Sequence, residues 1–154
     1  MQSLILKLRD KIARERPEAL EGLKVKDVIS RQVVSLDVDE EVDKALEKIS
    51  QYPYTVFPVV DHRNFPVGCI TLKELVDTTR RRPIDRRNIT VGLLALTTPV
   101  ILEEEAPLRE AIDLIAEKGE THLCVVKSIE EPILVGVLTE KDVFKALVRI
   151  MHSA

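Results

Sequence analysis

The sequence predicts an α/β (α+β) fold of two similar halves, each with the order strand, helix, strand, strand and helix, preceded by an N-terminal helix. The main observation is a segment that occurs twice: Gly68 and Gly136 are each followed by two apolar residues, a threonine, two spacers and an acid. Upstream apolar positions also match, as Val34 does with Val100. A half of roughly 50 to 60 residues makes only a marginal core. We therefore expect the two halves to pack face to face as a pseudo-twofold pair.

The composition limits the classes of protein that fit. A chain of 154 residues with 45% hydrophobic and 32% charged residues suits one compact domain or one tight pair of repeats. It has no apolar run long enough for a membrane span and no signal-peptide pattern, so we expect a cytoplasmic protein. A net charge of -3 and 3% aromatic residues argue against nucleic-acid binding. Cys69 and Cys124 lie in predicted strands without metal-ligand spacing, which favours buried thiols.

Residues 1–22 are predicted to form an amphipathic helix and a linker. Ser3 is a candidate cap and Pro17 a candidate stop for a helix whose apolar face carries Leu4, Ile5, Leu8 and Ile12. We expect this helix to pack on its own module or across a dimer.

The first repeat is predicted over residues 23–79. Its acidic stretch at 37–41 lacks the spacing and central glycine of a calcium loop, so we expect no metal site there. Pro58 predicts an edge strand or a bulge, because proline cannot donate to a β-ladder. The expected strands are residues 32–36, 56–60 and 67–70, and the expected helices are residues 42–51 and a segment that begins at Leu72.

A basic linker, residues 80–89, separates the repeats. It contains Arg80, Arg81, Arg82, Arg86 and Arg87, which form either a solvated connector or an electropositive rim for a phosphate or an acidic partner.

The second repeat is predicted over residues 90–154. Its strands are expected at residues 97–102, 121–126 and around Gly136. Pro107 lies near the start of a helix that buries Leu108, Ala111, Ile112 and Ile115, and Gly119 ends it. A final helix should run to His152.

The junction between the last strand and the last helix is the candidate site. Thr139 is well placed as an N-cap, and Asp142 follows it at the spacing of a capping box. This is a sufficient structural explanation for both residues. The repetition of the pattern at Thr71 and Glu74 also favours a ligand site, because a helix N-terminus attracts phosphate oxygens and a carboxylate can accept from ribose hydroxyls.

These segments, together with residues 26–30 and 57–61, resemble the tandem cystathionine-beta-synthase (CBS) domain pair, or Bateman module, over residues 25–151. The resemblance implies a regulatory module that binds AMP, ADP, ATP or a related adenosyl ligand in the cleft between two CBS repeats. It implies a sensor without catalytic activity, and no cofactor other than this regulatory ligand. The sequence shows no metal site and leaves open whether Mg²⁺ accompanies the nucleotide. It also implies a homodimer that signals to an effector protein.

The same resemblance assigns roles to individual residues. Asp142 would bind the ribose and Thr139 the phosphate, while the base would lie among Thr98, Pro99, Val100, His122 and Leu123. A second, weaker cleft would involve Val34, Phe57, Thr71 and Glu74. The chain departs from the family pattern at Glu74, where the acid is usually aspartate, and at Cys124, where the family usually has proline.

Three alternatives follow from the same residues. The chain could be a ligand-free protein-interaction or dimerisation module that works through its N-terminal helix or its arginine linker. It could bind nucleic acid through that linker, although its net charge disfavours this. An enzyme is least favoured, because the sequence has no Gly-rich phosphate loop or nucleophile elbow, and His122 and His152 have no acid-base partner at motif spacing.

Overall fold

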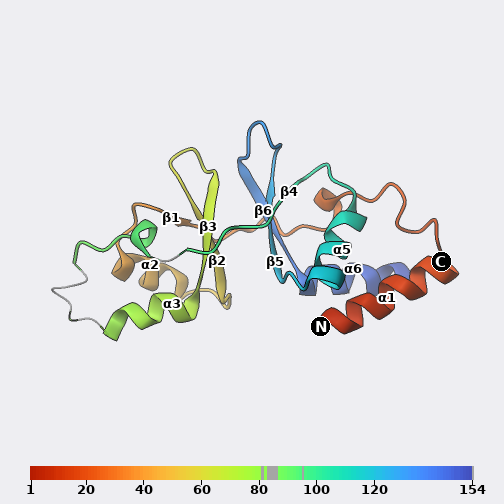
Figure 1. The fold of residues 1–154 in the computed structure, drawn as a ribbon, viewed down its shortest axis with the longest axis horizontal. Helices are drawn as coiled ribbons and strands as arrows, with labels where there is room; N and C mark the ends of the chain where they lie inside the picture. The colour runs from red at the N-terminus through yellow and green to blue at the C-terminus, as the bar shows by residue number, and fades with distance from the viewer. Residues whose placement is uncertain (81, 83–86, 95, 154) are drawn as a thin grey trace. The chain divides into compact units, whose positions relative to one another are not determined.

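The computed structural model describes residues 1–80, 82, 87–94 and 96–153 (Figure 1). Two compact units are present, one made of Met1–Val33 with Val100–Ala154 and the other of Val34–Pro99. Each unit contains one three-stranded sheet and the helices of one repeat, which confirms the predicted α/β fold with an N-terminal helix. The pseudo-twofold packing of the repeats stays a prediction, and Arg81 and Arg86 of the linker lie outside the described residues.

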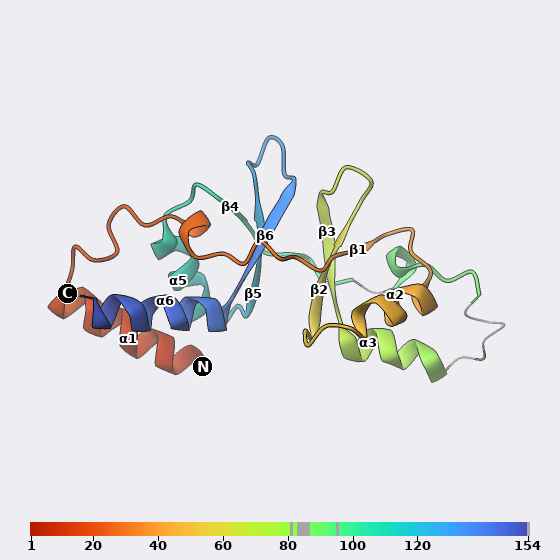
Figure 2. The same ribbon diagram turned by 180° about the vertical axis from the view of Figure 1, so that it is seen from behind.

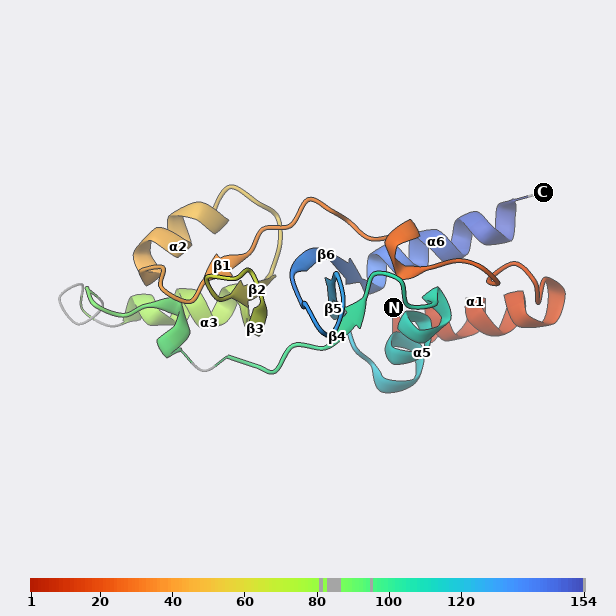
Figure 3. The same ribbon diagram turned by 90° about the horizontal axis from the view of Figure 1, so that it is seen from above.

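The unit of residues 34–99 contains the strands and α-helices of the first repeat. Its central strand β2 pairs in parallel with β1 and antiparallel with β3. Figure 3 shows α2 and α3 on the same side of this sheet. A hydrophobic core that includes Leu36, Ile49, Phe57 and Leu75 fills the space between them. The elements are β1 (Leu36–Asp37), α2 (Val42–Ile49), β2 (Val56–Val60), β3 (Pro66–Thr71), α3 (Leu72–Asp77) and two 3-10 turns, η2 (Thr78–Arg80) and η3 (Val91–Leu93).

The other unit contains the strands and α-helices of the second repeat and the N-terminal helix. Its sheet has the order β4-β5-β6, with β5 parallel to β4 and antiparallel to β6. Figure 2 shows α1 lying along α6, and α1 also contacts α5. None of the described helices is both long and apolar enough to cross a bilayer. The elements are α1 (Gln2–Glu15), η1 (Val25–Asp27), β4 (Ile101–Glu103), α5 (Leu108–Lys118), β5 (His122–Val126), β6 (Leu134–Thr139) and α6 (Glu140–His152).

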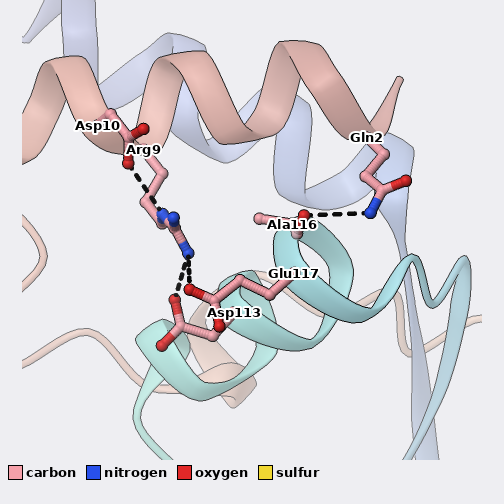
Figure 4. A network of polar contacts seen from close by, with 6 residues as sticks. All are labelled: Gln2, Arg9, Asp10, Asp113, Ala116 and Glu117. Atoms are coloured by element: carbon pink, nitrogen blue, oxygen red, sulfur yellow. Dashed lines mark hydrogen bonds and ion pairs between the residues drawn. The ribbon is translucent and has the colours of Figure 1, made fainter.

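The N-terminal helix packs on its own unit, as one of the two predicted arrangements requires. Ile5 and Ile12 are fully buried, whereas Leu4, which was expected on the same face, is 49% exposed. The predicted cap at Ser3 is wrong: α1 begins at Gln2 without a side-chain cap. Arg9 holds α1 to α5, because its Nη1 donates to Asp113 and Glu117, both at 3.0 Å (Figure 4).

The helix α5 confirms its prediction in detail. Leu108, Ala111, Ile112 and Ile115 are all fully buried. Gly119 ends the helix in the left-handed conformation with φ of 72°, which a residue with a side chain adopts at a cost. Cys124 is buried as expected, but Cys69 is only half-buried.

The first strand of each repeat is shorter than predicted. The strand expected at residues 32–36 is Leu36–Asp37, and the strand expected at residues 97–102 is Ile101–Glu103. The residues before them pair with other partners: Ser30 exchanges two backbone hydrogen bonds with Val137, and Thr97 exchanges two with Cys69. The apolar pattern predicted a strand in each place, but it could not indicate where the strand begins or which segment is its partner.

The segment that leads into each repeat packs against the other repeat. Ahead of the first repeat, Val25 N donates to Ala106 O, and Leu108 N donates to Leu23 O, so η1 lies at the N-terminus of α5. Ahead of the second, η3 makes the equivalent bonds at the N-terminus of α2, where Val91 N donates to Glu40 O. The compact units therefore do not coincide with the sequence repeats.

Residues 29–30 cross closely over β6, and residues 96–97 cross closely over β3. These crossings explain the repeated glycines. A Cβ atom on Gly136 would lie 2.8 Å from Ile29 Cδ1 and 2.9 Å from Ser30 O. A Cβ atom on Gly68 would lie 2.7 Å from Leu96 Cβ. These distances are too short for van der Waals contact, so only glycine allows the crossing segment to approach the last strand of each sheet this closely.

Pro58 lies in the central strand β2 and not in an edge strand, but the pairing register shifts between Val59 and Val60, so the irregularity is the predicted alternative that the structure shows. The opposite residue on β3, Cys69, makes its backbone N–H and C=O hydrogen bonds with Thr97 and not with Pro58. The missing N–H of Pro58 therefore costs no hydrogen bond to β3. At the matching place in the other sheet, Cys124 N donates to Val100 O at 2.8 Å. Proline has no N–H to make this bond. In agreement, β1 begins opposite Val59, one residue beyond Pro58, whereas β4 begins opposite Cys124.

Candidate functional site

The candidate site is the corner where β6 ends and α6 begins. Thr139 is the last residue of β6 and the N-cap of α6, and its Oγ1 accepts from Asp142 N at 3.2 Å. In return, Thr139 N and Thr139 Oγ1 both donate to Asp142 Oδ2 at 3.0 Å. The predicted capping box is therefore confirmed, and it fixes the orientation of the carboxylate.

The second carboxylate oxygen of Asp142 remains available. Among the described residues, Asp142 Oδ1 has no hydrogen-bond partner, and the residue is half-buried. The carboxylate lies in the first turn of a 13-residue helix, where the helix dipole stabilises negative charge. The corner thus presents one oriented acceptor oxygen that an incoming hydroxyl or amino group can reach.

His122 lies beside this corner. It is the first residue of β5 and pairs in register with Thr139. Its ring Nδ1 lies 2.9 Å from Thr121 Oγ1. Burial lowers the pKa of His122, and the negative charges of Glu140 and Asp142 partly oppose this effect. The imidazole is consequently held in its neutral form over a wider pH range than that of a free histidine.

Glu140 is the residue that the sequence analysis missed. Its backbone N–H donates to Thr121 O at 3.1 Å, which ties the start of α6 to the start of β5. Its side chain lies close enough to His122 to affect the pKa of that ring. The available signal was the contrast between the two motif copies, which have Glu140 in one and Leu72 in the other as the first spacer.

Other predicted residues of this cleft have different environments. Leu123 is fully buried in the core of its unit, and its predicted contact with a ligand stays a prediction. Val100 is half-buried, and its carbonyl accepts the Cys124 N–H. Thr98 and Pro99 belong to the unit of residues 34–99. Their place beside Asp142 stays a prediction.

The first repeat has an equivalent corner. Thr71 N and Thr71 Oγ1 donate to Glu74 Oε1 at 3.2 and 2.8 Å, and Thr71 Oγ1 accepts from Glu74 N at 3.1 Å. The longer glutamate therefore closes the same capping box as Asp142. Phe57 is fully buried in the core and the half-buried Val34 packs against that core, while their place in a second ligand cleft stays a prediction.

Among the residues that the structure describes, no cluster of three or more His, Cys, Asp or Glu side chains has the arrangement of a metal site.

Comparison with known proteins identifies the family. The family model named CBS domain matches residues 25–80 and 91–149. The chain is 25% identical over 122 residues to the inosine-5'-monophosphate dehydrogenase of Methanocaldococcus jannaschii, covering 79% of this chain but only 23% of that enzyme.

Two solved structures are similar to the whole repeat pair. CBSX2 of Arabidopsis thaliana, in complex with AMP, has a TM-score of 0.68 and 25% identity over 85% of this chain and 100% of that one. A Methanocaldococcus jannaschii protein described as a proposed archaeal homologue of g-AMPK has a TM-score of 0.70 and 25% identity, covering 82% of this chain and 50% of that one. With two matched stretches that together span most of its length, the chain belongs to the CBS domain family and carries two CBS domains in tandem.

Proposed function

We propose that this protein is a regulatory module that binds an adenosine nucleotide or a related adenosyl ligand at the Asp142 corner. The observation that carries the proposal is the open Oδ1 of Asp142, in a carboxylate whose other oxygen is fixed by Thr139. The similarity to CBSX2, whose structure contains AMP, supports an adenosine nucleotide as the ligand.

The chemistry of the corner suits a ribose. A ribose diol offers two hydroxyl donors, and a carboxylate oxygen with free lone pairs can accept from them. Because the capping box orients the carboxylate before the ligand arrives, binding does not have to immobilise this side chain. The neutral ring of His122 lies next to the carboxylate and would border the base or the sugar.

Regulation would follow from a shift between conformations. A ligand changes the conformation of such a module only to the extent that it binds one arrangement of the repeats more tightly than another. A homodimer and an effector protein are part of the same proposal. Light scattering of the purified protein with and without AMP tests the first of these directly.

Thermal unfolding with 1 mM AMP, ADP, ATP or S-adenosylmethionine tests the function. A ligand at a hundredfold excess over its Kd stabilises the native state by about 2.7 kcal/mol. For a chain of this size, that corresponds to a rise in Tm of about 5–10 °C. A wild-type protein whose Tm does not change with any of the four ligands would refute the proposal.

Two matched variants locate the site. Asp142→Asn keeps a carbonyl oxygen for the capping box but puts an amide donor where ribose needs an acceptor, so the ligand-induced shift should disappear. Glu74→Gln makes the same change in the first repeat and should leave the shift at Asp142 intact. The opposite pattern would place the ligand at the first repeat instead.

A further inference from the structure

The hydrogen-bond donors at the N-terminus of α6 are largely committed within the protein. Glu140 N donates to Thr121 O, and Asp142 N donates to Thr139 Oγ1. The hydroxyl of Thr139 donates to Asp142 Oδ2, so its proton is not available to a phosphate. Of the first-turn amides, that of Lys141 alone has no partner among the described residues. A helix N-terminus binds phosphate through several free N–H groups, and here most of them are occupied.

The charged side chains at this corner also disfavour phosphate. His122 pairs in register with Thr139, and Glu140 N donates to Thr121 O, so the first turn of α6 lies beside His122. The negative charges of Glu140 and Asp142 raise the pKa of that ring. The side chain of Glu140 has no hydrogen-bond or ion-pair partner among the described residues. Lys141 is exposed and supplies one positive charge to the same turn, which offsets one carboxylate and leaves the other.

The first repeat does not share this charge. Backbone pairing places Thr55 O against Leu72 N at 2.8 Å, as Thr121 O is placed against Glu140 N. Leucine therefore occupies the position of Glu140, and Val56 that of His122. The extra carboxylate is a specific feature of the second repeat and not a requirement of the capping box.

We infer that the Asp142 corner recognises its ligand through the nucleoside and gains little from the phosphates, and that Glu140 is the specificity-determining residue for this preference. The inference rests on the function proposed above. It predicts that adenosine, AMP, ADP and ATP bind with dissociation constants within about tenfold of one another when no divalent metal is present.

The test is calorimetric titration of the full chain with adenosine and with ATP in EDTA at about 0.1 M salt, where charges within a Debye length of about 10 Å still interact. Glu140→Gln removes the charge with little change of shape, and should strengthen ATP binding relative to adenosine by about threefold to tenfold. Glu130→Gln, in the exposed loop between β5 and β6, is the matched control and should leave the ratio unchanged. Lys141→Gln should weaken ATP binding by less than about threefold.

The outcomes separate the inference from the proposed function. If neither adenosine nor ATP binds the wild-type protein, the proposed function fails and the inference fails with it. If both bind, but the ATP-to-adenosine ratio is the same in wild type and Glu140→Gln, only the inference fails. A more than tenfold loss of ATP affinity in Lys141→Gln would also overturn it, because the phosphates would then supply much of the binding. Glu140→Ala serves as a second variant with the same expected direction.

Discussion

Replacing Gly136 by alanine tests the crossing of the N-terminal segment over β6. The new Cβ would lie 2.9 Å from Ser30 O and 2.8 Å from Ile29 Cδ1, so both must move by about half an ångström or more to reach ordinary contact distances. Ser30 O also accepts from Val137 N at 3.2 Å, and Val137 O accepts from Ser30 N at 3.3 Å. Displacing Ser30 strains both bonds.

The expected cost combines overpacking with weakened hydrogen bonds. Overpacking alone costs about 1–3 kcal/mol, and each hydrogen bond that is lost adds about 1 kcal/mol. We therefore expect Gly136→Ala to lower the free energy of unfolding by about 2–4 kcal/mol and Tm by about 4–16 °C.

Urea denaturation and amide hydrogen exchange provide the assay. Exchange at Ser30 and Val137 should accelerate in Gly136→Ala more than exchange at the core strand β5. The double variant Ile29→Ala with Gly136→Ala relieves the side-chain clash but not the clash with the Ser30 carbonyl, so part of the cost should persist. A Gly136→Ala protein as stable as wild type would refute the close approach of this segment.

Three further predictions concern charges of the same unit. Lys24 and Lys26 lower the pKa of Glu105 to about 2 from its ordinary 4.5, so this carboxylate contributes stability above pH 4.5 that is lost as the pH falls toward 2. Glu105→Gln should flatten Tm over that window. The pKa of His122 should lie below 6.5 by NMR titration, and Glu140→Gln should lower it further; because the folded state favours the neutral ring, His122 makes the protein less stable as the pH falls through this range. Arg9→Met should lower the free energy of unfolding by about 0.5–1.5 kcal/mol, since the partner acids are exposed, and 1 M NaCl should reduce the difference from wild type.

Local patterns in the sequence predicted the helices and the capping boxes well. The apolar spacing of α5 and the glycine after it correspond to buried residues and a left-handed C-terminus. The Thr-x-x-acid spacing predicted the box of Thr139 and Asp142, and the structure shows that the same spacing forms a box at Thr71 and Glu74, because every group in each lies within one helical turn. These features depend on neighbours in the chain, which a sequence displays directly.

Pairing between distant segments was not predictable in the same way. The residues directly before β1 and β4 were predicted to be strand. In the structure, the chain ahead of these strands pairs elsewhere, with Ser30 bonded to Val137 and Thr97 bonded to Cys69. Leu123 and Phe57 were assigned to ligand clefts through the family resemblance, and the structure shows both side chains fully buried in strands that bury four consecutive residues. Glu140 was overlooked because its importance depends on its proximity to His122, 18 positions earlier in the chain.

The division of the chain into one continuous and one interrupted unit determines the order of folding during synthesis. Val34–Pro99 can close as soon as it leaves the ribosome, whereas α1 must wait for α5 and α6 at the end of the chain. At about 5–20 residues per second, that interval lasts roughly ten seconds. Throughout it Ile5 and Ile12 have no core to enter, and a helix of 14 residues is only marginally stable alone. The apolar face of α1 therefore stays exposed during this interval, and a variant truncated before α5 should aggregate through that face.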